Sequence, residues 1–284
     1  MNILVTGANG QLGQELRSLP KTDATYFFTD IEDLDITHIE AIQHFVSENQ
    51  INVIINCVAY TNVSKAEEEI DKAELINTQA VANLAYVAKN NSATLIHIST
   101  DYVFGGNCNN IPVKEDAKTN PLGVYGRTKL MGEEKIINSG CKYIIIRTAW
   151  LYSSYGKNFV KTILRLSQEK ESLNVVYDQI GTPTYAGDLA LVIKMIAESE
   201  IRHKQGVYHF SNEGAISWFD FARAIVELSG SKCEIKACNS DEFGDSVSRP
   251  NYSVLDKTKI KQALGLSIPY WKDSLKVCLS KING

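Results

Sequence analysis

The sequence has no apolar run long enough to cross a membrane and no excess of basic residues. A membrane-spanning helix needs about 20 consecutive apolar residues, and no stretch of the 284 residues approaches that length. The formal net charge of −4 does not supply the basic face of a dedicated nucleic-acid binder. The first residues already belong to a predicted apolar strand, so we expect no secretory signal ahead of the fold. We therefore expect a cytoplasmic protein with no membrane or nucleic-acid partner.

Metal-binding patterns are missing as well. The six cysteines include no C-x-x-C pair, so the sequence does not indicate a zinc site, and we interpret them as reduced, mostly buried thiols. The five histidines lack metal-ligand spacing, and His97, inside an apolar segment, is expected to be a core residue. No metal ligand is predicted. The cysteines are Cys57, Cys108, Cys141, Cys233, Cys238 and Cys278.

The strongest local pattern lies in the first thirteen residues. A short apolar run at residues 3–5 has the length of a strand buried on both faces. Gly7, Gly10 and Gly13 follow at a spacing of three, and a helix over about residues 11–19 is predicted to start beside them. Glycines permit a tight turn, close approach of a pyrophosphate and close packing of helix on strand, and a helix N-terminus attracts an anion. The segment is typical of a dinucleotide-binding turn.

An acidic residue stands where a second strand ends. Residues 25–29 are predicted as that strand, and Asp30 follows it. A carboxylate at this place accepts hydrogen bonds from the adenosine ribose hydroxyls and repels a 2′-phosphate, so NADH is favoured over NADPH. Thr37, with Glu40 three residues later, is predicted to cap the next helix through a capping box.

Strands and helices alternate through the rest of the first half. This order predicts an α/β fold, a Rossmann-type doubly wound parallel sheet. We expect the NAD(P)-binding domain to comprise residues 1–150 and about 186–229, and a smaller, mixed substrate-binding lobe to comprise about 151–185 and 230–284. The aromatic stripe at Trp218, Phe219 and Phe221 is interpreted as core. Strands are predicted at 51–59, 94–101, 141–150, 173–177 and 206–210, and helices at 65–90, 123–137, 158–167, 188–198, 217–228 and 271–279.

Tyr125 and Lys129 form the candidate chemical pair. Spaced four apart on a predicted helix, they lie on one helical face. A free tyrosine has a pKa of about 10, which a neighbouring ammonium lowers, so Lys129 is expected to lower the pKa of Tyr125 and to hold the nicotinamide ribose hydroxyls. Thr100, at the end of strand 94–101, could donate a hydrogen bond to a substrate carbonyl oxygen and the developing alkoxide.

These motifs together resemble the extended short-chain dehydrogenase/reductases, and most closely their dTDP-4-dehydrorhamnose reductase family. The resemblance spans nearly the whole chain. Its most specific strings are Gly10-Gln-Leu-Gly13 and Arg147-Thr-Ala-Trp150. It covers residues 6–13, 56–62 with 65–67, 99–104, 125–129, 147–150, 178–184, and 249–253 with 255–256.

The resemblance implies reduction of the C4 ketone of dTDP-4-dehydro-L-rhamnose to dTDP-L-rhamnose by hydride from NADH or NADPH. It makes Tyr125 the proton donor, with Lys129 on the ribose and Thr100 on the reacting oxygen. The same resemblance places Asp101 and Trp150 against the sugar. Arg249 is a candidate for the diphosphate, with a structural salt bridge as its alternative. The implied cofactor contacts are Gly7, Gly10, Gln11, Leu12, Asp30, Asp35, Ile36, Ala59, Tyr60, Thr61, Tyr125 and Lys129.

Some members of this family bind Mg²⁺ at a dimer interface through carboxylates, one of them in the first helix. Glu15 occupies that helix here, and Asp188 is the later acid that comes nearest to supplying the second carboxylate. The partner motif is not convincing, so we expect Glu15 to be a solvated helix residue. The sequence is compatible with either a monomer or a homodimer.

Two alternatives stay open beside the reductase. One is another NAD-dependent sugar-nucleotide enzyme, an epimerase or a 4,6-dehydratase. A dehydratase should carry Glu after the acid that follows its active-site Thr, whereas Tyr102 follows Asp101. The other is a non-catalytic regulatory protein resembling the β subunit of methionine adenosyltransferase. The complete set of Thr100, Tyr125 and Lys129 favours an enzyme.

Overall fold

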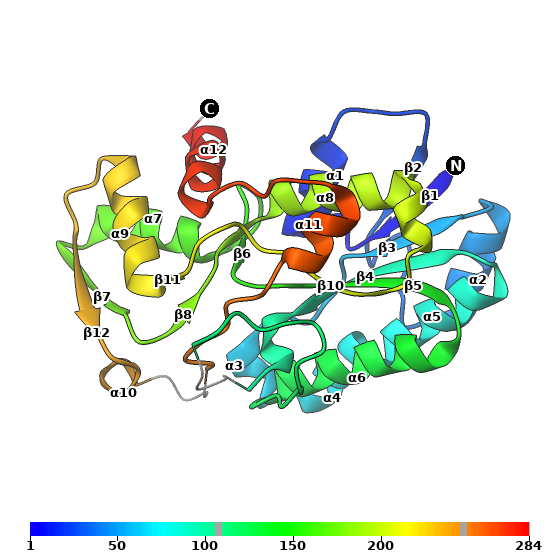
Figure 1. The fold of residues 1–284 in the computed structure, drawn as a ribbon, viewed down its shortest axis with the longest axis horizontal. Coiled ribbons are helices and arrows are strands. Elements are labelled where there is room, and N and C mark those ends of the chain that lie inside the picture. The colour runs from blue at the N-terminus through cyan, green and yellow to red at the C-terminus, as the bar shows by residue number, and fades with distance from the viewer. Residues whose placement is uncertain (106–109, 245–248, 284) are drawn as a thin grey trace.

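A six-stranded parallel sheet forms the centre of the larger lobe in the computed structural model, which describes residues 1–105, 110–244 and 249–283. The strand order is β2–β1–β3–β4–β5–β10 (Figure 1). The order reverses between β1 and β3, and ligands bind beyond the carboxyl ends of strands at such a switch point. The strands are β1 (Asn2–Thr6), β2 (Thr25–Thr29), β3 (Val53–Asn56), β4 (Thr94–Thr100), β5 (Lys142–Thr148) and β10 (Gly206–His209).

Helices cover both faces of this sheet, which confirms the predicted Rossmann-type fold (Figure 1). On one face lie α1 (Gln11–Ser18), α8 (Ala186–Glu198) and α11 (Thr258–Leu264). On the other lie α2 (Ile39–Glu48), α5 (Ala80–Asn90) and α6 (Val124–Ser139). Successive strand residues serve opposite faces: Ile3 and Val5 belong to the first core, and Leu4 to the second. Each such fully buried side chain contributes about 1.5–3 kcal/mol of burial free energy.

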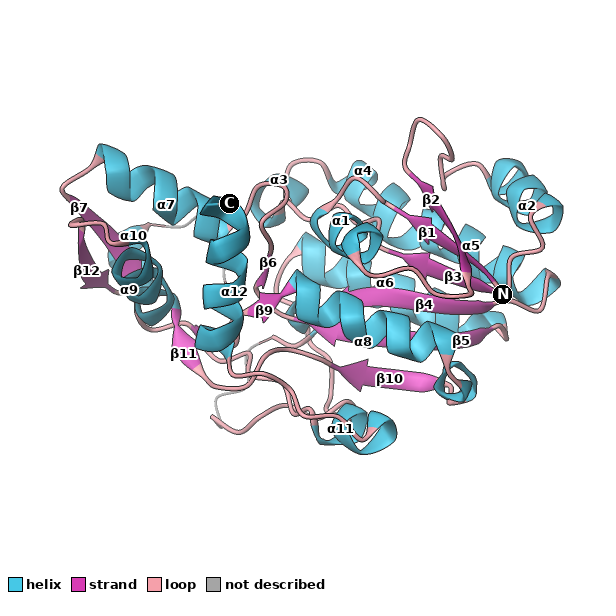
Figure 2. Ribbon diagram, turned by 90° about the horizontal axis from the view of Figure 1, so that it is seen from above, coloured by secondary structure: helices cyan, strands magenta, loops and turns pink. Residues whose placement is uncertain are grey.

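The smaller lobe has its own core, at the left of Figure 2. Strands β7 and β12 pair in parallel, and α7, α9 and α12 pack beside them. Two short strand pairs, β6–β9 and β8–β11, are also present. The elements are β6 (Leu151–Tyr152), α7 (Phe159–Glu169), β7 (Ser172–Val176), β8 (Ile180–Gly181), β9 (Thr184–Tyr185), β11 (Ile216–Ser217), α9 (Trp218–Ser229), β12 (Glu234–Cys238), α10 (Ser240–Phe243) and α12 (Trp271–Asn283).

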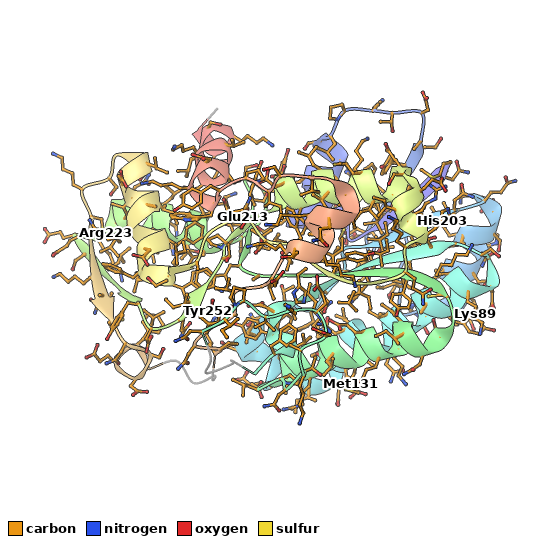
Figure 3. The ribbon with its side chains drawn as sticks, in the orientation of Figure 1. Lys89, Met131, His203, Glu213, Arg223 and Tyr252 are labelled. Carbon is orange, nitrogen blue, oxygen red and sulfur yellow. The ribbon has the colours of Figure 1, made fainter. Side chains whose placement is uncertain are left out.

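Two helices pack with a different lobe from the one predicted for them. Helix α9, placed with residues 186–229 in the larger domain, packs on α7, β7 and β12 because its apolar side chains face that small sheet. Helix α11 packs on β10, and Ile260 joins the core of the large sheet. Tyr252, which pairs with Ile180, and Glu213 are labelled in Figure 3, between the two lobes.

Two other local predictions are corrected. The helix predicted over 65–90 is divided into α3 (Val63–Ala66), α4 (Ile70–Glu74), a π-helical turn (Leu75–Gln79) and α5. Helix α2 begins after His38 without a side-chain cap, because the Thr37 hydroxyl donates instead to Asp35 (2.8 Å). The remaining short elements are 3₁₀ turns at Asp101–Val103 and Glu200–His203.

No helix within the described ranges is long and apolar enough to span a bilayer.

Candidate functional site

The glycine turn has the geometry that its spacing predicts. Gly7 adopts a left-handed backbone with φ +70°, and a Cβ there would lie 2.9 Å from the Val58 nitrogen. A Cβ at Gly13 would lie 2.5 Å from the Gly7 carbonyl oxygen, so only glycine lets α1 approach this closely. Helix α1 begins after Gly10 with no side-chain cap on its first N–H groups. The turn therefore leaves backbone donors for an anion.

A cavity of about 550 Å³ lies beyond the carboxyl ends of the strands. Both lobes line it, and most of the predicted site residues meet there. From the prediction it contains Gly10, Gln11, Leu12, Ala59, Thr61, Thr100, Asp101, Tyr125, Lys129, Trp150 and Arg249. Further lining residues that the sequence did not single out for the site include Lys157, Asn158 and Trp218.

Five predicted cofactor residues are not on the wall of this cavity. Gly7 shapes the turn, and Asp30 accepts a hydrogen bond from the Asn9 amide (2.8 Å), which places its carboxylate beside that turn. Asp35 accepts from the amide and hydroxyl of Thr37, and these bonds lower the pKa of its carboxyl. The remaining two are Ile36, buried in the core beneath α2 and α5, and Tyr60, whose hydroxyl donates to Glu69 (3.0 Å).

Asn77 is a positioning residue that the sequence did not reveal. Its side chain exchanges hydrogen bonds with the backbone of Tyr60, at 2.9 Å to the amide and 3.1 Å to the carbonyl, and it also donates to Thr128 on α6. The π-helical turn brings this buried amide to the segment that follows β3. Asn77 thereby fixes the backbone between Ala59 and Thr61, which line the cavity.

Thr100 and Tyr125 are adjacent in space. Thr100 ends β4, Tyr125 lies in the first turn of α6, and both side chains line the same cavity. Burial raises the pKa of Tyr125 above its usual value, and the neighbouring Thr100 hydroxyl offsets this only in part. The expected lowering by Lys129 is therefore corrected. The Lys129 ammonium group is directed at the Ile98 carbonyl (2.7 Å) and at His97 Nε2 (3.2 Å).

Two further buried groups have shifted pKa values. Burial lowers the pKa of Lys129 to about 8, against the opposing effect of Glu133. Glu133 is itself held in a buried ion pair with Arg147 (2.6 Å). Burial raises the pKa of Asp101 to about 6, while hydrogen bonds from Ser253 and Thr100 act in the other direction. Such shifts at one cavity are typical of a functional site.

A pair of stacked indoles forms the wall facing the smaller lobe. Trp150 and Trp218 lie with ring centroids 3.6 Å apart and planes 12° from parallel. Trp218 packs against the core of the smaller lobe, as the sequence predicted, and it also lines the cavity. Trp218 and Arg249 also border a second cavity of about 780 Å³, which α7 and β7 line.

Glu15 and Asp188, the two carboxylates considered and not predicted as metal ligands, are bound within the protein. Glu15 is only 1% exposed, not solvated as predicted, and its carboxylate accepts from the Ser153 hydroxyl (2.7 Å) and the Lys281 ammonium (3.2 Å). Asp188 accepts from Asn212 and Ser274. Both carboxylates thus have internal donors where a cation would need free oxygens. Among the residues that the structure describes, no cluster of three or more metal-ligating side chains exists.

The cysteine prediction is confirmed for five of the six thiols. Cys57 is partly exposed, and the other four described cysteines are buried and free. Cys108 lies outside the described residues. His97 is a buried core residue, as predicted, and it is hydrogen bonded through both ring nitrogens.

Comparison with known proteins agrees with this geometry. Residues 1–283 match the family described as RmlD substrate binding domain. The chain is 40% identical to a dTDP-4-dehydrorhamnose reductase of Aggregatibacter actinomycetemcomitans, over 96% of this chain and 97% of that one. It is also 40% identical to the spore coat polysaccharide biosynthesis protein SpsK of Bacillus subtilis, over 98% and 97%. A dTDP-4-dehydrorhamnose reductase structure from Bacillus anthracis, in complex with NADP, superposes with a TM-score of 0.94 at 38% identity, over 99% of both chains. The chain therefore belongs to the dTDP-4-dehydrorhamnose reductase family.

Proposed function

We propose that this chain reduces the C4 ketone of dTDP-4-dehydro-L-rhamnose to dTDP-L-rhamnose. The observation that carries the proposal is a single cavity in which Gly10, at the start of α1, shares a wall with Thr100, Tyr125 and Lys129. An anion held by the N-terminus of α1 and a ketone beside Tyr125 then meet in one space. Family membership supports the same reaction.

The cofactor site fits a nicotinamide dinucleotide. The uncapped N–H groups at the start of α1 suit its diphosphate, Ala59 and Thr61 border the adjoining space, and Lys129 can reach ribose hydroxyls. When bound, the reduced cofactor supplies the hydride that adds to the ketone carbon. The chain has to hold the two reactants together and manage the proton.

Tyr125 is the proton donor in this proposal. Its raised pKa keeps the hydroxyl protonated at neutral pH, so it can give its proton to the ketone oxygen as negative charge develops there. The Thr100 hydroxyl donates a second hydrogen bond to the same oxygen. Because an alkoxide is a stronger base than a phenolate, the proton moves toward the product.

The second cavity is the proposed site of the nucleotide half of the substrate. It adjoins the reaction cavity at Trp218 and Arg249. We place the substrate diphosphate at Arg249, whose fork of donors suits it, and the sugar between Trp150 and Asp101. Substrate binding is thereby assigned to the smaller lobe, broadly residues 151–185 and 230–284, together with α9.

We infer a preference for NADH. Asp30 lies at the end of β2 with its carboxylate beside the glycine turn, where it accepts from ribose hydroxyls and repels a 2′-phosphate. The kcat/KM ratio for NADH over NADPH should fall in Asp30→Asn, because the repulsion is removed. Glu32→Gln, an exposed acid two residues away, is the matched control. An equal ratio in wild type and Asp30→Asn would contradict the inference.

The reductase assay follows loss of the reduced cofactor's absorbance with dTDP-4-dehydro-L-rhamnose, and the product is identified by NMR. Turnover that yields dTDP-L-rhamnose supports the proposal. The precursor dTDP-4-keto-6-deoxy-D-glucose is the matched substrate control, since it carries the same ketone on a sugar of different configuration. A protein that binds NADH but oxidises it with neither sugar would instead be a regulatory relative.

A further inference from the structure

A buried chain of polar side chains runs across three neighbouring strands beneath α6. Thr6, Asn56 and His97 lie directly opposite one another on β1, β3 and β4. All are at most 1% exposed, as is Lys129, the residue at the end of the chain. Adjacent contacts measure 2.9 Å from Thr6 to Asn56, 3.1 Å from Asn56 to His97 and 3.2 Å from His97 to Lys129.

The orientation of the Asn56 amide follows from its neighbours. Asn56 Oδ1 accepts from the backbone N–H of Val58 (3.0 Å), and a backbone N–H can only donate, so the oxygen must occupy that position. The amide nitrogen Nδ2 therefore faces His97 Nδ1 and donates to it. His97 Nδ1 must then be the unprotonated, accepting nitrogen.

This arrangement determines where the proton of His97 sits. Burial holds the pKa of His97 well below its usual value, so the ring is neutral and carries one N–H. With Nδ1 accepting from Asn56, that N–H lies on Nε2, which points at Lys129 Nζ. An ammonium group has three donors and no acceptor, whereas a neutral amine has a lone pair. The contact is a hydrogen bond only in the amine form.

We infer that His97 is a positioning residue whose Nε2–H, fixed by Asn56, holds Lys129 as a neutral amine in the enzyme without substrates. Lys129 keeps one donor for the Ile98 carbonyl (2.7 Å). Glu133, one turn along α6, favours the ammonium, but Arg147 and Ser99 already bind its carboxylate. The other ionisable groups around this end of α6 are Tyr125, Asp101 and Glu67, the last bound to the Val124 amide.

The consequence concerns the reaction proposed above, on which this inference rests. A lysine held as an amine changes its protonation near neutral pH, where an ordinary lysine with a pKa of about 10 stays charged. Ribose hydroxyls of a bound cofactor can compete with His97 for the Lys129 amine. Once Lys129 no longer accepts from His97, it can take up a proton from solvent and become an ammonium. The strand network thereby couples the lysine's charge to occupation of the cofactor site.

The tautomer of His97 tests the inference without any turnover. Protein labelled with ¹⁵N in histidine is examined by long-range ¹H–¹⁵N NMR, and the His97 signals are assigned by their loss in His97→Gln. We expect the Nε2–H tautomer in the wild type. Asn56→Asp places an acceptor at Nδ1, so we expect the proton to move there and Nε2 to become an acceptor for the ammonium.

The kinetic readout should change in step with the tautomer. In Asn56→Asp, the ionisation assigned to Lys129 in the pH profile of kcat/KM for NADH should move up by about one pH unit, the size of a hydrogen bond to a charged group. Thr6→Val is the matched control, because Val58 still fixes the Asn56 amide. An Nδ1–H tautomer in the wild type, or a folded Asn56→Asp with unchanged tautomer and profile, would overturn the inference. An inactive wild type with the expected tautomer would count against the reductase proposal alone.

Discussion

Tyr125 carries the proton in this account, and its role can be separated from cofactor binding. Tyr125→Phe removes the hydroxyl and keeps the ring, so kcat should fall by about 10²–10⁴, the usual contribution of a general acid. The dissociation constant for NADH, measured by fluorescence titration, should stay within about twofold. A large loss of NADH affinity would show that Tyr125 acts in binding instead.

Asp101 should make stability depend on pH. The folded protein holds its proton up to about pH 6, while the unfolded chain releases it near pH 4. The folded state binds more protons in this window, so the free energy of unfolding falls as the pH rises through it.

Asp101→Asn should abolish that contribution. Relative to the wild type, the variant should gain about 1–3 kcal/mol in the free energy of unfolding between pH 4 and pH 7. Urea unfolding of both proteins across this range measures the difference. A difference that does not change with pH would contradict the assignment.

Residues were predictable where local sequence determines their place. Thr100 was recognised because it ends a strand, and Tyr125 and Lys129 because they are four residues apart on one helix. All three line the same cavity. The burial of Glu15 and the place of Trp218 at the cavity were missed because distant segments determine both: Glu15 is bound by Ser153 and Lys281. Trp218 stacks on Trp150. Neither contact leaves a periodic signal.

At the scale of elements, an ion pair between Lys281 and the buried Glu15 joins α12 to α1. With the Lys281 ammonium 3.2 Å from one oxygen and Ser153 donating to the other, the Glu15 carboxylate has both oxygens bound within the protein. Adding EDTA or Mg²⁺ should therefore leave the melting temperature unchanged within about 1 °C. In Lys281→Ala the buried carboxylate loses its charged partner, and the free energy of unfolding should fall by about 1–3 kcal/mol. A melting temperature that drops in EDTA would show a bound metal.

Helix α9 should affect substrate rather than cofactor. Trp218→Ala removes a ring that lines both cavities, and the loss of about 1 kcal/mol of contact with the substrate should raise KM for the sugar nucleotide about fivefold. KM for NADH should not change. Phe219→Ala on the same helix is the control, because Phe219 packs on the lobe core and does not line the cavity. An equal rise in both variants would indicate a general packing defect.

Long elements followed from the sequence, and short ones did not. Runs such as 53–55 and 143–146 are apolar throughout because helices cover both faces of the sheet, and these runs made the strands recognisable in the sequence. The π-helical turn at Leu75–Gln79 continues a helical pattern, so periodicity does not reveal it. The two-residue strands β6, β8, β9 and β11 are too short to show any period.

For the whole molecule, the sequence indicated two lobes but could not assign every helix to its lobe. Side chains from both lobes line the cavity of about 550 Å³. Helices α9 and α11 each belong to a core that the order along the chain does not indicate. Such long-range packing depends on how the chain crosses between the lobes, and one sequence does not encode it in any local pattern.

The central claim is that hydride passes from the nicotinamide to C4 of the dTDP-sugar in this cavity. The most direct measurement supplies NADH carrying two deuteriums at C4 of its nicotinamide ring, together with dTDP-4-dehydro-L-rhamnose, and locates the label by NMR. The account predicts one deuterium at C4 of dTDP-L-rhamnose for each NADH consumed, formed about 10²–10⁴ times more slowly with Tyr125→Phe under the same conditions. Product without deuterium at C4, or consumption of NADH without dTDP-L-rhamnose, would contradict it.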